Sequence, residues 1–200
     1  MTVSQTHINQ ALANKSGNLR PLPSLPNKPL LRVVEPQGQI EVHTAAHSGS
    51  FPVVLSEALR SAGLGSQVLI AQLLKGGVNQ GASKGINLCG RLQWLRPNLP
   101  FYLGQDKLVD NQLSEQFLKA QNAVEEVWQF CKQSLLKGNV QKLVLDEIGL
   151  AVKLGFIKDT DLIQTLESRP GSIDVVLTGP FIPTEVIAMA DQVTELRCCK

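Results

Sequence analysis

The sequence predicts an α/β fold with a mostly parallel central sheet covered by helices on both faces. From residue 39 onward, short apolar runs alternate with amphipathic segments of helical spacing, which is typical of consecutive β-α-β units. Most of these runs are apolar at successive positions, as expected for strands that are buried on both faces. We therefore expect a three-layer domain over residues 39–200, with any ligand bound at the carboxyl ends of the strands.

Residues 1–38 are a different kind of sequence. The stretch "RPLPSLPNKPLLRVVEPQGQ" is rich in proline, which cannot donate a backbone hydrogen bond in a helix or a central strand. We expect an extended or disordered arm that precedes the domain. The leucines between the prolines favour docking of this arm onto a protein partner, and a plain flexible arm is the alternative.

The first half of the domain is predicted to contain one helix and four strand-like segments. Residues 52–63 place apolar side chains at helical spacing, and Gly63 is suited to end that helix. The strand-like segments are residues 40–44, 66–76, 86–95 and 99–104.

The second half contains the clearest helix, residues 114–139, in which apolar residues recur at threes and fours. Ser114 is expected to cap its start and Gly138 to close its end. Residues 140–155 are predicted to form a continuous apolar strand that carries two carboxylates. The remaining elements are a helix at 159–170, a strand at 172–179, a helix at 183–190 and a strand at 191–199.

Composition excludes several classes of partner. The chain has 19 Lys and Arg against 17 Asp and Glu, and its basic residues are scattered, so no nucleic-acid partner is expected. Its apolar runs are too short to span a bilayer, and its N-terminus lacks a secretory-type apolar segment. We expect a cytoplasmic protein without a membrane partner. Cys198 and Cys199 lack metal-ligand spacing and are interpreted as reduced thiols, with a redox or metal role as the alternative.

The strand-like run "LVLDE" ends in two adjacent carboxylates, Asp146 and Glu147. A rigid strand can deliver such a carboxylate to a Mg²⁺ ion that is held by phosphates. The two residues are therefore candidate magnesium ligands. A solvated strand end is the alternative interpretation.

The segment between the first strand and the first helix keeps the small residues of a phosphate-binding loop but not its lysine. Where a working loop has Lys and then Ser or Thr, this chain has Ser50 and Phe51, followed by Pro52. Loss of the lysine removes a contact worth about 1.5–3 kcal/mol. Lys75 is a candidate replacement, and a solvated lysine is the alternative. The candidate nucleotide-binding residues are Ala45, Ala46, His47, Ser48, Gly49, Ser50 and Lys75.

With these pieces in order, residues 40–197 resemble the ATP:corrinoid adenosyltransferases, which have the P-loop NTPase fold. The resemblance rests on the segments "ALRSAGLGSQVLIAQLLKG", "VWQFCKQSLL", "KLVLDEI", "SRPGSIDVVLTG" and "ADQVTELR". It implies a homodimer that transfers the adenosyl group of ATP to a Co(I) corrinoid with Mg²⁺ and releases tripolyphosphate. It also implies that Asp146 and Glu147 are the metal and nucleotide carboxylates, and that residues 45–52 are the phosphate loop.

The chain departs from the family pattern at both substrate sites. The family's Lys-Thr-Thr is replaced by Ser50-Phe51-Pro52, and its corrin-contacting Phe-x-Trp segment aligns with residues 110–112, Asp-Asn-Gln. Phe101 and Tyr102 lie upstream and are the candidates to replace that corrin contact.

Three functions follow from this pattern. The first is a catalytically lapsed relative that binds a partner protein, a nucleotide or a corrinoid without turnover. The second is an active adenosyltransferase with a remodelled site. The third is a nucleotide-dependent switch or phosphotransferase, which the missing loop lysine disfavours.

Overall fold

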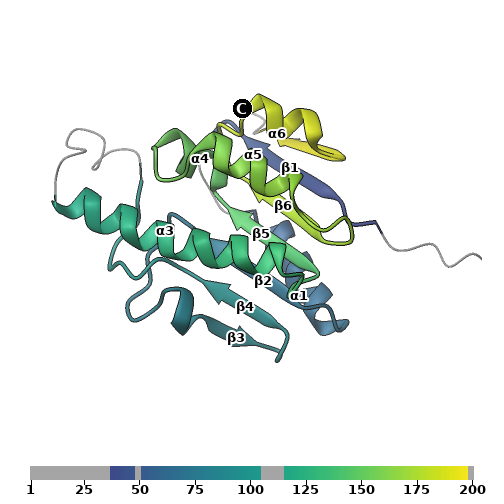
Figure 1. Ribbon diagram of the computed structural model, residues 1–200, viewed down its shortest axis with the longest axis horizontal. Coiled ribbons are helices and arrows are strands. Elements are labelled where there is room, and N and C mark those ends of the chain that lie inside the picture. Colours follow the sequence, from purple (N-terminus) through teal and green to yellow (C-terminus); the bar gives the residue numbers. More distant parts are fainter. Residues whose placement is uncertain (1–36, 48–50, 105–114, 198–200) are drawn as a thin grey trace, which may run out of the picture. The chain divides into compact units, whose positions relative to one another are not determined.

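The sheet has seven strands in the order β3-β4-β2-β5-β6-β1-β7 (Figure 1). The computed structural model describes residues 37–47, 51–104 and 115–197. All neighbouring strands are parallel except β3 and β4, which pair antiparallel at one edge. The strands are β1 (Ile40–Ala45), β2 (Val68–Gln72), β3 (Ile86–Leu88), β4 (Leu92–Leu95), β5 (Lys142–Asp146), β6 (Asp174–Thr178) and β7 (Gln192–Leu196).

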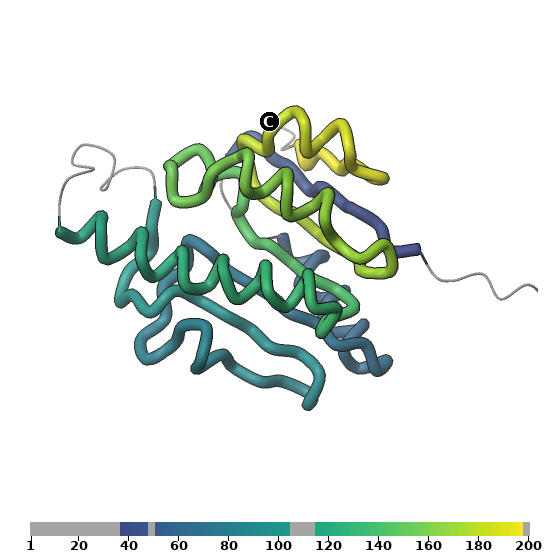
Figure 2. Tube along the Cα trace, in the orientation of Figure 1, coloured from purple at the N-terminus to yellow at the C-terminus, as the bar shows by residue number. Residues whose placement is uncertain are grey.

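Helices cover both faces of this sheet, so the predicted three-layer α/β fold is confirmed. Alternate residues of β2 and β5 enter separate apolar cores, because neighbouring side chains of a strand point to opposite faces. Leu69 and Leu143 pack into the core with α3, while Ile70 and Val144 pack against α1. Figure 2 shows α3 on one face of the sheet and α1 on the other. The helices are α1 (Pro52–Gly63), the short 3₁₀ helix η1 (Ala82–Lys84), α3 (Glu115–Leu136), α4 (Ile148–Lys153), α5 (Asp159–Glu167) and α6 (Thr184–Met189).

The predicted long helix is present as α3. Its buried stripe includes Val124, Val127, Trp128 and Cys131. Gly138 adopts the left-handed conformation with φ of 68° and ends the helix as expected. Burial raises the pKa of the Cys131 thiol to about 12, so this cysteine is an inert core residue. Ser114 lies outside the described residues, as do Cys198 and Cys199.

Several predicted element boundaries are wrong. Residues 140–155 are not one strand: β5 ends at Asp146, Glu147 takes a left-handed turn, and α4 follows. Residues 86–95 form two short strands with a turn between them. Residues 99–104 contain only an isolated bridge between Lys75 and Tyr102.

The first helix ends at the predicted residue, Gly63. Its C-cap is Leu64, and the left-handed residue that follows is Gly65, with φ of 109°. The strand predicted at residues 148–153 is instead the helix α4. A continuous apolar run does not by itself distinguish a buried strand from a buried helix.

A charged cluster on the outer helical layer ties α3 to α5. Asp161 accepts hydrogen bonds from Trp128 Nε1 at 2.6 Å and from Lys132 Nζ at 2.9 Å. Partial burial opposes ionisation of Asp161, but the hydrogen bonds from Trp128 and Lys132 outweigh it, and the pKa of Asp161 is lowered below 3.8.

Among the described helices, none is both long and apolar enough to cross a bilayer.

We predict that Asp161→Asn lowers the free energy of unfolding at neutral pH, by no more than about 1 kcal/mol because the carboxylate is partly exposed. A lowered folded-state pKa stabilises the protein above the unfolded pKa of Asp and ceases to do so as the pH falls through the folded value. Urea unfolding between pH 2.5 and 7 should therefore show the deficit of the variant at pH 5–7 and its disappearance below the ordinary Asp pKa of 3.8. A deficit independent of pH would contradict this account.

Candidate functional site

Asp146 lies at the carboxyl end of β5, in the middle of the sheet, and is almost completely buried, with 1% of its surface exposed. Its Oδ1 atom accepts a hydrogen bond from Thr178 Oγ1 at 2.8 Å. Its Oδ2 atom accepts one from Gln72 Nε2 at 2.7 Å. Gln72 and Thr178 end the strands on either side of β5, so the parallel register brings all three polar side chains to one edge.

Lys75 completes the surroundings of this carboxylate. Its ammonium Nζ lies 2.9 Å from Asp146 Oδ2, and its side chain is 23% exposed. A buried carboxylate needs an opposite charge or several hydrogen bonds, because removal of its hydration is costly. Here Lys75 supplies the charge, and Gln72 and Thr178 supply the additional hydrogen bonds. The structure thus brings together two residues that the sequence put forward separately, Lys75 as a phosphate-binding candidate and Asp146 as a metal-binding candidate.

Glu147 follows at the strand-to-helix turn in a left-handed conformation, with φ of 61°. Its backbone N–H donates to Thr178 Oγ1 at 3.0 Å, which fixes the turn to β6. Gly179 approaches so closely that an added Cβ atom would lie 3.0 Å from Glu147 Cα, and it has φ of 116°. The non-glycine left-handed residue is held by these contacts, and such conformations are concentrated at functional sites.

Tyr102 meets the second carboxylate. Its hydroxyl group lies 3.1 Å from Glu147 Oε2 and 3.2 Å from Oε1, and the ring is half-exposed. The isolated bridge to Lys75 positions the backbone of Tyr102. Two candidates from different parts of the sequence, Lys75 and Tyr102, therefore converge on the two carboxylates.

Gln72 extends the polar network toward β4. Its side-chain Oε1 accepts from Trp94 Nε1 at 3.0 Å and from Arg96 Nε at 2.9 Å. The Arg96 guanidinium also lies over the Trp94 indole, 5.7 Å from the ring centroid. One continuous chain of contacts thus runs from Arg96 through Gln72 to Asp146.

The start of α1 lacks the chemistry of a triphosphate loop. Phe51 stands where a hydroxyl residue would contact a metal; it is 4% exposed and makes an edge contact with His43. The helix has no side-chain cap and begins with Pro52, which has no N–H group to donate. An apolar ring and a proline therefore replace a metal ligand and a phosphate donor.

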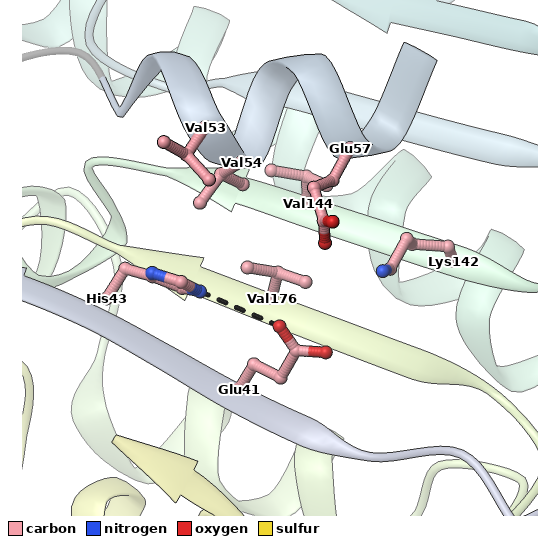
Figure 3. A pocket seen from close by; sticks show the side chains of 8 residues that line it. All are labelled: Glu41, His43, Val53, Val54, Glu57, Lys142, Val144 and Val176. Atoms are coloured by element: carbon pink, nitrogen blue, oxygen red, sulfur yellow. Dashed lines mark ion pairs between the residues drawn. The ribbon is translucent and has the colours of Figure 1, made fainter. Parts of the chain in front are cut away.

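A small cavity lies beneath α1, where the helix packs on β1, β5 and β6 (Figure 3). Its volume is about 20 Å³, which is enough for a single water molecule and not for a ligand. His43 Nε2 lies 3.6 Å from Glu41 Oε2 beside it, as the dashed line in Figure 3 shows. This cavity is a packing feature of α1.

The remaining predicted residues are divided between described and undescribed positions. Ala45 ends β1, and Ala46 and His47 follow it in a bend. Ser48, Gly49 and Ser50 lie outside the described residues, as do residues 110–112.

Phe101 is 39% exposed and lines a hollow of about 470 Å³, separate from the Tyr102 contact to Glu147. Other residues that line this hollow include Asn98, Gln116, Lys119 and Asn122.

The groups that surround the Asp146 carboxylate do not fit a resident magnesium ion in this arrangement. Both carboxylate oxygens accept hydrogen bonds from protein groups, and one of those groups is the Lys75 ammonium. The hydroxyl ligand expected at the start of α1 is the buried Phe51. Within the described parts of the chain, no cluster of three or more His, Cys, Asp or Glu residues is arranged to hold a metal.

Sequence reasoning missed Gln72 and Arg96. Each follows an apolar run at the end of a parallel strand, and that position was the available signal. Thr178 occupies the same kind of position, at the end of β6.

The comparisons with known proteins agree with this fold. Residues 36–200 match the family model described as ATP:corrinoid adenosyltransferase BtuR/CobO/CobP. A corrinoid adenosyltransferase of Escherichia coli is 27% identical over 165 residues, covering 82% of this chain and 79% of the relative. One of Salmonella typhimurium is 27% identical over 167 residues, covering 83% and 80%.

A further relative is longer than this chain. An uncharacterized protein of Nostoc sp. is 25% identical over 170 residues, which is 80% of this chain and 44% of that protein. The matching region therefore spans less than half of the length of the Nostoc protein.

We predict that Asp146→Ala destabilises the fold by about 3–5 kcal/mol, because it removes a buried carboxylate that pairs with Lys75 and accepts from Gln72 and Thr178. Adding Lys75→Met should recover part of this loss. The double variant should therefore lose less unfolding free energy than the Asp146→Ala and Lys75→Met variants lose in sum. The measurement is urea unfolding of all three variants. Glu57→Ala is the control, since the Glu57–Arg60 pair is solvent-exposed, with side chains 48% and 70% exposed, and it should cost under about 1 kcal/mol. Equal losses at Asp146 and Glu57 would contradict the central role of the Lys75 pair.

Proposed function

The chain belongs to the ATP:corrinoid adenosyltransferase family BtuR/CobO/CobP, and from this premise we propose that it is a catalytically lapsed member that binds without transferring an adenosyl group. Members of the family use ATP and corrinoid substrates. In our proposal this chain keeps the family scaffold and its carboxyl-edge site for binding a nucleotide, a corrinoid or a partner protein.

The observation that carries the proposal is the start of α1. Adenosyl transfer from ATP requires the triphosphate to be gripped and its charge neutralised as it leaves, which is the work of a loop lysine and a metal. In this chain the lysine position is Ser50, and the following residue is the buried Phe51. A phenylalanine in contact with His43 cannot supply a hydroxyl ligand to a metal.

The ion pair at Asp146 supports the same conclusion. An ammonium group 2.9 Å from Oδ2 neutralises the carboxylate that a metal would need. Metal binding there requires Lys75 to be displaced, and the hydrogen bonds from Gln72 and Thr178 to be rearranged or shared. The altered loop and the neutralised carboxylate are separate obstacles to the same reaction.

A specific observation favours the active alternative as well. Lys75 and Tyr102, the two residues expected to compensate for losses at the nucleotide and corrin sites, both contact the paired carboxylates. In an active enzyme Lys75 would turn from Asp146 to the phosphates. This hypothesis therefore also requires another partner for the Asp146 carboxylate.

We predict that the purified protein forms no adenosylated product from MgATP and a reduced Co(I) corrinoid, under conditions in which the Escherichia coli relative serves as the positive control. We also predict that the combined variant Ser50→Lys, Phe51→Thr and Pro52→Thr binds MgATP at least about tenfold more tightly than the unchanged chain, because it restores a charge-assisted contact. Spectrophotometry of the corrinoid and isothermal titration calorimetry measure the two results.

Product formation by the unchanged protein would overturn the proposal. Lys75→Ala then separates the alternatives: a loss of ATP use in that variant would establish the remodelled active site. Unaffected turnover in Lys75→Ala would exclude Lys75 as the replacement for the loop lysine.

A further inference from the structure

Arg96 is a partly buried cation at the carboxyl edge of the sheet, directly after β4. It lies on the same edge as Asp146, two strands away in the order β4-β2-β5. Open parallel sheets bind their ligands at this edge. The position of Arg96 therefore faces the region where a ligand is expected.

The guanidinium is held in a fixed orientation by two groups. Gln72, which is only 3% exposed, accepts from the Arg96 Nε atom at 2.9 Å. The Trp94 indole lies beneath the guanidinium at 5.7 Å, a distance typical of a cation–π contact. Because Gln72 also accepts from Trp94 Nε1, one buried amide holds both parts of this arrangement. An arginine fixed through Nε keeps its two terminal nitrogens available for a planar, bidentate contact.

The charges at this edge leave a role for an anion. Lys75 pairs with Asp146, whereas the Arg96 bond to Gln72 is to a neutral amide. In the described stretches of the chain, no carboxylate forms an ion pair with Arg96; the pairs involve other residues. A partly buried guanidinium is costly to leave without a counter-charge.

We propose that Arg96, oriented by Gln72 and Trp94, binds a phosphate group. Arginine matches the geometry of phosphate oxygens through two parallel N–H bonds, and its weak hydration suits a partly buried site. The phosphate belongs to a free oligophosphate or to a nucleotide, since both present the same terminal oxygens. In this chain the anion-binding role of the altered loop before α1 has passed to the end of β4.

This site deepens the proposed function, because it names a ligand class for a binding protein of the family, and it rests on that proposal only for the absence of turnover. The two claims fail in different experiments. Adenosylated product would overturn the lapse and leave the Arg96 site standing, whereas loss of the Arg96 site would leave the absence of turnover unaffected.

The test is isothermal titration calorimetry of the full chain with tripolyphosphate and with ATP, both without divalent metal. Arg96→Gln should weaken tripolyphosphate binding at least about tenfold. Arg91→Gln is the matched control, since Arg91 is an exposed arginine at the opposite end of β4, and it should change the affinity less than about twofold. Arg96→Lys, which keeps the charge but loses the fork, should be intermediate. Circular dichroism melts confirm that each variant is folded.

Tighter binding of ATP than of tripolyphosphate would identify a nucleotide site, and equal binding would identify an oligophosphate site; either result with the Arg96 dependence supports the proposal. Equal weakening by the Arg96 and Arg91 variants, or no tripolyphosphate binding by the unchanged chain up to millimolar concentration, would overturn it.

Discussion

The buried carboxylate of Asp146 is the constraint on which the rest of this edge depends. A carboxylate with 1% exposure must be compensated within the protein, because its hydration shell has been removed. Compensation comes from the ends of the two flanking strands and from Lys75 beyond β2. The parallel register makes this possible, since it sets Gln72 opposite Asp146 and aligns β6 so that Thr178 reaches the other oxygen.

Satisfying Asp146 in this way determines how its neighbours can act. Gln72 is shared between the carboxylate and Arg96, so the arginine is oriented by the same network that neutralises the aspartate. Thr178 accepts from the backbone of Glu147 and thereby fixes the left-handed turn into α4. In our proposal, the edge that serves a metal and a triphosphate in an active member of the family is here largely satisfied by its own side chains. The buried Phe51 at the start of α1 is, in the same proposal, part of that loss.

The fold was largely predictable from sequence, and the site only in part. Apolar runs that alternate with helical periodicity predicted a parallel sheet between two helical layers, because burial on both faces leaves that pattern. The prediction of one strand over residues 140–155 was wrong, because Ile148–Lys153 has the apolar pattern of a buried strand. It forms a helix after the backbone turn at Glu147. Asp146 and Lys75 were predictable as candidates, but their pairing depends on the register of β2 against β5, which local sequence does not encode. The roles of Gln72 and Arg96 could not be predicted, because they depend on a contact between residues more than twenty positions apart.

Whether Lys75 takes the place of a metal cation at Asp146 is tested most directly by electron paramagnetic resonance of Mn²⁺ titrated into the protein with ATP present. We predict that the protein binds no Mn²⁺ beyond the amount that the same concentration of ATP binds alone, and that Asp146→Asn leaves the spectrum unchanged. One bound Mn²⁺ per chain that is lost in Asp146→Asn would contradict this prediction, and would show that the carboxylate still serves a metal.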